Sequence, residues 1–477
     1  MGGGGSRLGK LLRLLPDSKT GDVIMMRQAE GIVAVATAPG RSGIGVIRFS
    51  GAESASLGLI KGMTGISSPQ PRHAYFTSVL DTAGKVLDKG IVIWFKAPHS
   101  YTGEDVVEFQ VHGNPVLLNL IIKNILAFDN SVRLAEPGEF TKRAFLNGRL
   151  DLAQAEAVMD FVNASSESAL RAANRSLSGG FSKECEQIEE ELIELRTQVE
   201  AILDFPEEEI GALQEGKINE KIGGISAHLQ TVIRTADQGQ LLQEGAVVVL
   251  VGSPNVGKSS LLNRLSEKDV AIVTEVPGTT RDLLGNAILI NGVRVQLVDT
   301  AGLRQTDDVV ESAGISRTLK QIEKADMVLH LEACNVSQSP STLELIHEHL
   351  PEGTPVLHVV NKIDLLEEPF KSSADRIGIS AKFGTGIEDL KRAILKIVGF
   401  DGTVQSVYMA RRRHLEELRK AQNHVSQAKD ILNSSARQLD LVAEELRLAG
   451  TAMGRILGEF SPDDLLGKIF STFCIGK

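Results

Sequence analysis

The sequence predicts a multidomain α/β plus all-α protein of 477 residues. Three observations support this fold class. Short apolar runs separated by glycine-rich turns occupy 31–147, as in a small α/β domain. Apolar residues at helical spacing occupy 148–244 and return after residue 400. Between these helical stretches, an apolar strand leads into a glycine-rich loop and a helix, which begins a second α/β domain.

The first α/β domain is predicted over 31–147. We expect strands within 32–37, 44–48 and 90–95, and a buried helix over 116–126. The glycines between 40 and 45 separate two of these strands and are typical of a turn. These elements amount to one small α/β domain at the start of the fold.

Residues 1–30 are left out of that domain. The run Gly-Gly-Gly-Gly-Ser after Met1 fits an N-myristoylation pattern nominally and also has the composition of a flexible linker. We interpret the segment as a tag or a disordered extension. A lipid anchor or a transit peptide is the alternative.

Heptad spacing predicts a helical bundle around the second α/β domain. A stripe with alternating steps of four and three comprises Phe181, Cys185, Ile188, Leu192, Leu195, Val199 and Ile202. The glutamates between them predict a solvated acidic face: Glu186, Glu189, Glu190, Glu191 and Glu194. Pro206 ends this helix. A second stripe, Leu415, Leu418, Val425, Ala428 and Leu432, predicts one bundle from 148–244 and 401–477, with 245–400 inserted.

The glycine-rich loop at 252–259 has the sequence Gly-Ser-Pro-Asn-Val-Gly-Lys-Ser. Strand, G-x-x-x-x-G-K-S and helix is the context of a loop that holds phosphates with its backbone N–H groups. Lys258 would reach the β- and γ-phosphates, and the Ser259 hydroxyl would ligate Mg²⁺. The predicted nucleotide-binding set also includes Asn255, Val256, Gly257 and Ser260.

A second group of motifs selects the base. In Asn361-Lys362-Ile363-Asp364, the Asp364 carboxylate can accept both N–H donors on the guanine edge, which adenine does not offer. Ser380-Ala381-Lys382 fits the supporting base loop. In Asp299-Thr300-Ala301-Gly302, Asp299 would hold Mg²⁺ through water and Gly302 would contact the γ-phosphate. Their order along the chain predicts a Ras-like G domain that binds GTP.

The hydrolytic machinery departs from the Ras pattern. There a Gln after the Asp-x-x-Gly motif positions the attacking water, and an arginine finger neutralises charge. Here the position holds Leu303, which can do neither. The chain must therefore supply both functions elsewhere, and Thr274–Asp282 is the candidate switch, with one threonine completing the Mg²⁺ shell.

The motifs together resemble the MnmE (TrmE) family of tRNA-modification GTPases. The resemblance rests on Pro254–Ser259, Pro277–Asp282, Asp299–Arg304 and the chain end Phe473–Lys477, and it runs from about Ile32 to Lys477. In that family a K⁺ ion replaces the arginine finger when two G domains meet across their nucleotides. Such a cation stabilises the negative charge that grows at the β/γ bridge.

The resemblance assigns further roles within the G domain. It implies K⁺ ligands at Asn255, Thr274, Val276 and Thr279, and a Mg²⁺ ligand at Thr280. Glu311 would orient the catalytic water through a second water. From the residues alone, Glu311 would be an ordinary acidic surface residue.

The N-terminal domain resembles the family's folate-binding domain, which holds a tetrahydrofolate derivative as one-carbon carrier. The resemblance implies folate contacts at Arg48, Glu108, Arg149 and Lys477. Position 149 is often Lys in the family, and Arg keeps the charge but changes the donor geometry. The residues alone leave open that Arg48 and Glu108 form an ordinary solvated ion pair.

Cys474 and a basic run also admit two readings. The Cys-Ile-Gly-Lys ending matches the family motif, in which the cysteine lies near the folate site and is required for modification. A buried inert thiol is the alternative, since a reactive one needs a lowered pKa. Arg411-Arg412-Arg413-His414 is either an RNA contact or the start of a solvated helix.

Composition limits the partners. The net charge of −10 argues against a broad nucleic-acid-binding face, so bound RNA would need a local patch or a partner's charge. Three cysteines form neither a disulfide framework nor a zinc pattern, which favours the reducing cytoplasm. No apolar run approaches the roughly 18 residues of a membrane span.

The leading hypothesis combines the motifs with the resemblance. We expect a K⁺-activated GTPase that acts as a homodimer with a flavin (FAD)-dependent, MnmG-like partner in a heterotetramer. Together they would modify carbon 5 of the tRNA wobble uridine, U34, with a one-carbon unit from folate. The rival is a GTP-dependent switch or ribosome-assembly factor without modification chemistry, and specific binding of a reduced folate would separate the two.

Overall fold

The computed structural model describes residues 30–204, 212–266, 287–299, 320–334, 349–373, 375–400, 407–434, 438–459 and 463–476. The chain forms two compact units. The first unit comprises Met1–Ala155 and Ser461–Lys477, and the second unit comprises Glu156–Phe460. The expected division placed all of 401–477 in the helical part. The structure instead joins the chain end to the first unit, because helix α16 (Asp463–Ser471) contacts helix α5 (Glu139–Leu146).

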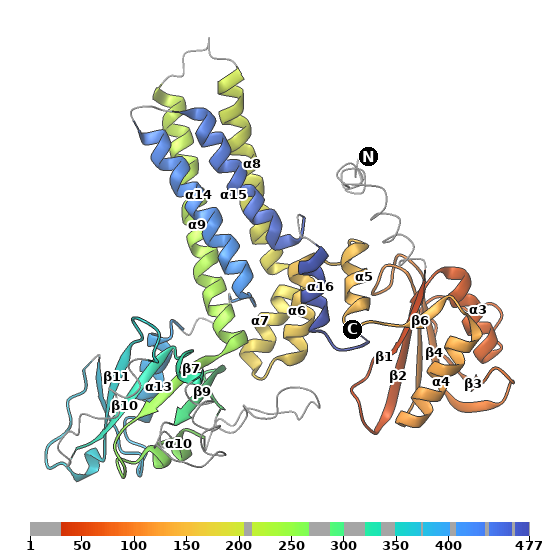
Figure 1. Ribbon diagram of the computed structural model, residues 1–477, viewed down its shortest axis with the longest axis horizontal. Coiled ribbons are helices and arrows are strands. Elements are labelled where there is room, and N and C mark those ends of the chain that lie inside the picture. The colour runs from red at the N-terminus through yellow and green to blue at the C-terminus, as the bar shows by residue number, and fades with distance from the viewer. Residues whose placement is uncertain are drawn as a thin grey trace. The chain divides into compact units, whose positions relative to one another are not determined.

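The first unit is built on a six-stranded sheet in the order β3-β4-β5-β2-β1-β6. Its strands are β1 (Gly31–Val35), β2 (Ser42–Gly51), β3 (Tyr75–Leu80), β4 (Val86–Phe95), β5 (Asp105–Gly113) and β6 (Val132–Leu134). All pairs are antiparallel except β1 with β6. One face packs against α3 (Glu53–Thr64) and α4 (Pro115–Phe128), and α5 carries Phe140 into a small cluster with Ile32 and Ala34 (Figure 1).

Two expectations for this unit need correction. The helix predicted over 116–126 exists as α4, with Pro115 in its first turn and the Asn114 side chain accepting the Val116 N–H. It is only half buried, because it covers one face of the sheet and turns its other side outward. Val116, for example, is 76% exposed. The glycines of 42–45 do not form a turn, because Ser42 already begins β2 and pairs with Gly113.

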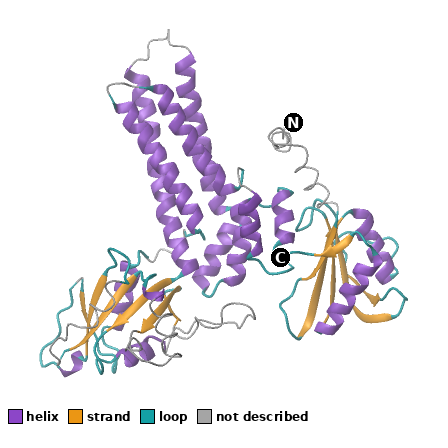
Figure 2. Ribbon diagram, viewed as in Figure 1, coloured by secondary structure: helices purple, strands orange, loops and turns teal. Residues whose placement is uncertain are grey.

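The second unit contains the predicted bundle. Its long helices are α8 (Gly180–Asp204), α9 (Ala212–Glu244), α14 (Arg412–Asn433) and α15 (Leu439–Leu457), preceded by α6 (Leu152–Asn163) and α7 (Glu167–Leu177). α8 packs on α9 and α15, and α14 packs on α9 and α15, so helices from both sides of the insertion share one core (Figures 1 and 2). No helix among the described residues is long and apolar enough to cross a membrane.

The heptad stripe is confirmed for its first six members. From Phe181 to Val199 each is at most 1% exposed. α8 is described as far as Asp204, and the predicted helix break at Pro206 lies outside the described residues. The predicted acidic face is solvated at Glu190 and Glu194, which are exposed, although Glu194 also contacts Lys221 on α9. Glu191 is half buried, because it contacts His228 on the neighbouring helix.

The inserted G domain has a six-stranded sheet in the order β12-β11-β10-β7-β9-β8. Its elements are β7 (Ala246–Val251), α10 (Lys258–Ser266), β8 (Ala287–Ile290), β9 (Val293–Asp299), β10 (Met327–Ala333), β11 (Val356–Asn361), the 3₁₀ turn η2 (Ile363–Leu365), β12 (Arg376–Gly378) and α13 (Ile387–Ile397). Only β8 runs antiparallel to its neighbour. This parallel sheet brings the carboxyl ends of β7, β9, β10 and β11 to one edge, where ligands of such sheets bind.

Candidate nucleotide and folate sites

The phosphate loop runs from the end of β7 to the start of α10. Asn255 and Gly257 have φ values of 64° and 101°, so the loop turns through left-handed backbone at both positions. A Cβ at Gly252 would meet the carbonyl oxygen of Leu331, which explains the glycine there. Asn255, Ser259 and Ser260 are exposed and accessible to a ligand.

Lys258 is anchored to its own loop. Its Nζ donates to the carbonyl oxygens of Gly252 at 2.6 Å and Ser253 at 3.3 Å. The ammonium therefore spans the loop that the sequence assigned to phosphates. Phosphate oxygens entering the loop would offer this nitrogen stronger, charged acceptors than the two carbonyls.

Asn361 joins the phosphate loop to the base loop. Its Nδ2 donates to the Val256 carbonyl at 2.8 Å, and its Oδ1 accepts the Ala381 N–H at 3.0 Å. The residue is 3% exposed and sits at the end of β11. Both amide atoms are satisfied, so the side chain has one orientation. We call this arrangement the Asn361 clasp.

The base loop is held around the clasp. Ser380 Oγ donates to Asp364 Oδ1 at 2.5 Å, which fixes the carboxylate assigned to guanine. Lys362 Nζ donates to the Asn255 carbonyl at 3.0 Å, and Arg264 of α10 donates to the carbonyls of Ala381 and Lys382. The segments to which the sequence assigned guanine and phosphate binding thus lie together.

The described residues fit a Mg²⁺ ion where the sequence placed one. Ser259 is an exposed residue at the second position of α10, and Asp299 ends β9. Asp299 is the register partner of Leu250 on β7, one residue before the end of the strand that leads into the phosphate loop. Hydroxyl and carboxylate oxygens suit this hard cation.

Part of the predicted G-domain site lies outside the described residues. This applies to Thr274, Val276, Thr279, Thr280, Thr300, Ala301, Gly302 and Glu311. Of the predicted K⁺ ligands, the structure describes Asn255 alone. The roles of all these residues remain predictions.

Arg48 and Glu108 form a pair at the centre of the first unit's sheet. They are register partners on β2 and β5, and the guanidinium lies 2.9 Å from Glu108 Oε1. The rings of Tyr101 and Phe140 lie 5.3 and 5.8 Å from the Arg48 guanidinium carbon. The pair is half buried, with side chains 22% and 15% exposed, so a fully solvated ion pair does not describe it.

The chain end lies beside this pair. Gly476 packs against the Val35 carbonyl, and the neighbouring Ala34 is the register partner of Arg48. The carbonyl of Cys474 accepts the Gly138 N–H at 3.4 Å, and the Cys474 side chain is exposed, not buried as the alternative expected. Arg149 is exposed and its side chain lies against Gly103. Lys477 lies outside the described residues.

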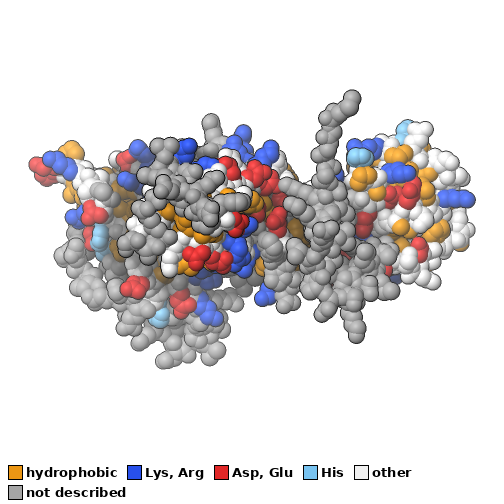
Figure 3. All heavy atoms as spheres, turned by 90° about the horizontal axis from the view of Figure 1, so that it is seen from above, with side chains coloured by type: hydrophobic (Ala, Val, Ile, Leu, Met, Phe, Trp, Pro, Cys, Tyr) orange, Lys and Arg blue, Asp and Glu red, His pale blue; other side chains and the backbone are white. Residues whose placement is uncertain are grey.

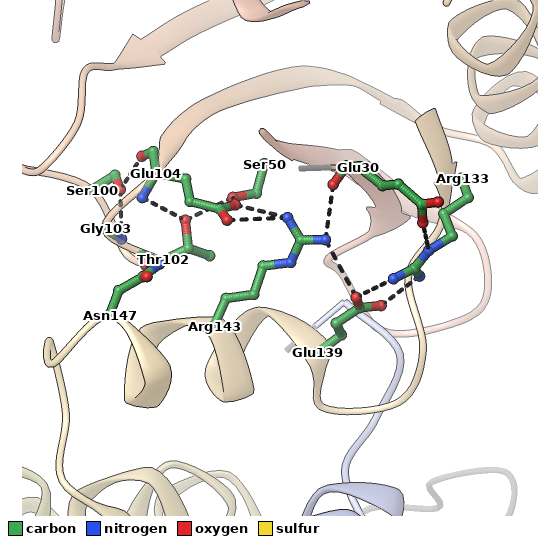
Figure 4. Close-up of polar contacts among 10 residues, drawn as sticks. All are labelled: Glu30, Ser50, Ser100, Thr102, Gly103, Glu104, Arg133, Glu139, Arg143 and Asn147. Carbon is green, nitrogen blue, oxygen red and sulfur yellow. Dashed lines mark hydrogen bonds and ion pairs between the residues drawn. The ribbon is translucent and has the colours of Figure 1, made fainter. Parts of the chain in front are cut away.

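A buried ionic cluster adjoins these residues and was not predicted from the sequence. Arg143 is 3% exposed and donates to Glu104 at 2.9 Å, to Glu139 at 3.4 Å and to the Glu30 carbonyl (Figure 4). Arg133 also holds Glu139 at 2.6 Å. Burial raises the pKa of Glu139, but the arginines and the Glu136 N–H, which donates to this carboxylate, outweigh burial and lower the pKa below the usual value.

The loop above this cluster is tied to the same carboxylate. Ser50 Oγ donates to Glu104 Oε2 at 2.7 Å and lies 2.7 Å from the Thr102 hydroxyl, and Asn147 Nδ2 donates to the Thr102 carbonyl. One signal could have found the cluster. Phe140, Arg143 and Ala144 lie on one helical face, which places an arginine among core residues.

In the basic run at 411–414, His414 is buried and Arg411 and Arg413 are half buried. Arg413 binds Glu156 with two hydrogen bonds of 2.8 and 2.6 Å, and Arg411 donates to Asp160 at 2.9 Å. His414 Nε2 donates to Glu156 Oε2 at 2.8 Å, since its Nδ1 accepts the Arg411 N–H. Only Arg412 is exposed. The interpretation as a solvated helix start was therefore wrong for Arg411 and Arg413, because their partners on α6 lie about 250 residues earlier. The RNA contact stays a prediction.

The comparisons with known proteins cover almost the whole chain. The families described as "MnmE helical domain" and "GTP-binding protein TrmE N-terminus" match residues 152–474 and 31–149. The tRNA modification GTPase MnmE of Bordetella parapertussis is 51% identical over 450 residues, which is 94% of this chain and 99% of that protein. The protein of the same name from Burkholderia thailandensis is 49% identical over 469 residues, 95% and 100% of the two chains.

Solved structures resemble part of the chain. The G domain of the T. maritima FeoB iron transporter is 26% identical over 32% of this chain and 98% of that one, with a TM-score of 0.23. Aquifex aeolicus Era bound to GDP and AlF₄⁻ is 25% identical over 38% of this chain and 66% of that one, with a TM-score of 0.26. At these TM-scores the likeness carries no argument about the arrangement of the chain.

Proposed function

The chain belongs to the MnmE family of tRNA modification GTPases, and from this premise we propose that it uses K⁺-activated GTP hydrolysis to drive modification of the wobble uridine U34 at carbon 5. The Asn361 clasp carries the proposal, because one amide holds the phosphate loop and the base loop together. A guanine nucleotide bound by both loops would bring its phosphates to Lys258 and Ser259. The coarser activity, GTP hydrolysis in tRNA modification, follows from the family.

Within the G domain, each residue has a separate task. Asp364, oriented by Ser380, accepts the N–H donors of guanine, and Lys258 neutralises the phosphates. Ser259 and Thr280 hold Mg²⁺, with Asp299 acting through water. The K⁺ ligands are Asn255, Thr274, Val276 and Thr279, and the ion supplies the positive charge that Leu303 cannot. Glu311 orients the attacking water.

In the first unit, Arg48 and Glu108 would hold the folate, with Arg149 and Lys477 at its edge. A guanidinium and a carboxylate on adjacent strands offer donors and acceptors to a flat heterocycle, and the Tyr101 and Phe140 rings provide apolar surface. The folate supplies a one-carbon unit. Cys474, exposed at the chain end beside these residues, acts in the modification step.

The tRNA would need charge from another source. In the view of Figure 3, Lys and Arg side chains are interspersed with Asp and Glu over the described surface. The net charge is −10. We therefore propose that an FAD-dependent, MnmG-like partner supplies much of the attraction for tRNA, in a cytoplasmic assembly built on a homodimer of this chain.

The first test is GTP hydrolysis in KCl and NaCl at matched ionic strength, for the wild type and Asn255→Ala. We expect strong K⁺ stimulation that the substitution abolishes. Asn263→Ala, an exposed amide on α10, is the matched control and keeps the stimulation. Equal wild-type rates in the two salts would contradict the cation mechanism.

Base selection is tested by Asp364→Asn. The amide can donate to the carbonyl that xanthine carries where guanine carries an amino group, so preference should move from GTP to xanthosine triphosphate. Asp389→Asn on the exposed side of α13 leaves the preference unchanged. Unaltered GTP preference in Asp364→Asn would remove this residue from the base site.

Folate binding is tested by calorimetry with a reduced folate and Arg48→Ala. The substitution should weaken binding at least tenfold, since a half-buried charge-assisted contact is lost. Lys96→Ala is the control, because Lys96 forms an exposed ion pair with Glu53 in the same unit. Absence of folate binding together with tight ribosome association would favour the rival assembly factor.

The modification itself is tested in cells. A strain without this protein should lose the carbon-5 group at U34, as read by mass spectrometry of tRNA nucleosides. The wild-type gene should restore the group, whereas Cys474→Ser should not. Normal U34 modification in the deletion strain would overturn the proposed function.

A further inference from the structure

One face of the G-domain sheet carries two histidines side by side. His330 on β10 is the register partner of His358 on β11, which in turn pairs with Arg376 on β12. Glu332 lies two residues after His330 and therefore on the same face, because side chains alternate along a strand. On the other side, buried Val251 of β7 pairs with His330 and gives the group an apolar edge.

The distances between these side chains match those between ligands of one metal ion. Nδ1 of His330 lies 3.2 Å from Nδ1 of His358 and 3.5 Å from Oε1 of Glu332. Three potential ligand atoms, one from each residue, all lie within 4.8 Å of one another. Two ligands about 2.0–2.1 Å from a tetrahedral ion are themselves about 3.3 Å apart. His330 therefore already has both neighbours at ligand–ligand spacing.

Arg376 positions the carboxylate. Its guanidinium lies 3.5 Å from Oε2 of Glu332, while Oε1 faces His330. A second group that holds a ligating carboxylate in one orientation is a regular part of metal sites. The side chains of His330 and Glu332 are 19% and 16% exposed, so the group is enclosed but still reached by solvent.

We propose that His330, Glu332 and His358 form a binding site for a divalent transition-metal ion of the Zn²⁺ class. Two imidazoles and one carboxylate leave a fourth tetrahedral position for water, whereas Mg²⁺ prefers oxygen ligands in octahedral geometry. The ion would tie β10 to β11. Since β11 ends in Asn361, three residues after His358, the ion would brace the strand that carries the clasp.

A different histidine in the bundle shows what such a site requires. His228 contacts Glu184 through Nε2 and Glu191 through Nδ1, at 3.1 and 3.4 Å. The two ring nitrogens point in different directions, so the carboxylates cannot meet at one ion through a single imidazole atom. The His228 group also combines imidazole and carboxylate but lacks the geometry of a metal site, which makes His228 the control.

The test is Zn²⁺ binding to the full-length protein after removal of metals with a chelator, in millimolar Mg²⁺ and without nucleotide. A chromophoric chelator that competes for Zn²⁺ reports stoichiometry and affinity. We expect one Zn²⁺ per chain at micromolar concentration or below. His330→Gln and His358→Gln should each weaken binding at least tenfold, and His228→Gln should bind like the wild type.

A second readout separates ligation from folding. Co²⁺ bound in the site should give the visible absorption of a tetrahedral ion, and His358→Gln should lose it. GTP binding shows that each variant is folded, and Glu332→Gln replaces any variant that fails this check. Wild-type protein without Zn²⁺ binding, or glutamine variants that bind like the wild type, would overturn the proposal. The result is independent of the proposed function, which is read by hydrolysis and U34 modification.

Discussion

Two buried ionic clusters, one in each unit, are built in opposite ways. In the first unit a cation is central, because Arg143 lies between the carboxylates of Glu104 and Glu139 (Figure 4). In the second unit an anion is central, because Glu156 accepts hydrogen bonds from Arg413 and His414. Both central groups are at most 3% exposed. Each is stabilised by partners that neutralise its charge and satisfy its hydrogen bonds.

The clusters differ in the lengths of chain that they join. Arg143 contacts the side chains of Glu139 and Glu104, 4 and 39 positions away, and the Glu30 carbonyl, 113 positions away, all within the domain that carries the folate candidates. Glu156 contacts Arg413, 257 positions away, across the whole inserted G domain. The first cluster therefore shapes a local site, whereas the second closes the bundle around an insertion. Arginine–glutamate clusters can therefore either shape a site within one domain or join segments on the two sides of an inserted domain.

Substitution of Glu156 should have the largest effect. Glu156→Ala leaves Arg413 and His414 without their central partner, and we expect a loss of about 3–5 kcal/mol of unfolding free energy, as for other broken buried pairs. The measurement is denaturant unfolding followed by helical circular dichroism, to which the bundle contributes most. Fluorescence of Trp94, the single tryptophan, reports the first unit and should keep its midpoint. A shift in both signals would contradict the separation of the clusters.

Acid should weaken the Glu156 cluster next. Burial and Arg413 lower the pKa of His414 to about 4, whereas an unfolded histidine titrates near 6.5. Between these values the unfolded chain binds more protons, so the bundle loses stability as the pH falls from 6.5 to 4. The expected loss is on the order of 3 kcal/mol, at 1.36 kcal/mol per pKa unit.

The remaining groups of this cluster act at lower pH. His414 and Arg413 hold the pKa of Glu156 well below its usual range despite burial, so its contribution is lost only below about pH 4.5. Burial raises the pKa of Asp160, which acts in the opposite sense. His414→Gln should make the bundle's unfolding free energy less dependent on pH between 6.5 and 4. An unchanged slope would contradict a neutral His414.

Substitution of Arg143 should have a smaller, local effect. In Arg143→Ala, Glu139 keeps its partner Arg133, and only Glu104 loses its main charged partner. We therefore expect a loss of about 2 kcal/mol of unfolding free energy. The Trp94 transition should move while the helical transition stays. Arg133 is one-third exposed, so Arg133→Ala should cost less stability than Arg143→Ala. The reverse order would contradict the central place of Arg143.

Arg412 provides the smallest expected effect and the sharpest control. It stands between Arg411 and Arg413 in the sequence but is 80% exposed and pairs with Glu416 one helical turn away. Arg412→Ala should leave both transitions within experimental error, because exposed pairs contribute little. A loss comparable to that of Glu156→Ala would show that the basic run acts as a whole.

The sequence predicted the nucleotide motifs and the bundle because their signals are local. A phosphate loop needs fixed spacing after a strand, and the stripe from Phe181 to Val199 repeats every turn. These features depend on neighbours within a few residues. The Asn361 clasp was not predicted, because its two hydrogen bonds join residues 105 and 20 positions apart.

The failures share one physical cause, which is pairing at long range. Three arginines in a row have the composition of a solvated helix, and only the pairing with Glu156 and Asp160 on α6 leaves two of them half buried. The register that sets His330 beside His358 is equally invisible along the chain. Charge patterns predict structure well for solvated faces and poorly wherever a distant segment supplies the counter-charge.

The insertion of the G domain also affects the order of synthesis. The chain leaves the bundle after α9 and returns at Tyr408 and Met409, which lie against Gly239 and Ala172. During translation, α8 and α9 therefore emerge with their apolar stripes uncovered, and the whole G domain follows before α14 and α15 can cover them. The bundle can complete its core only after α14 and α15 have been synthesised, and Glu156 can bind Arg413 only then.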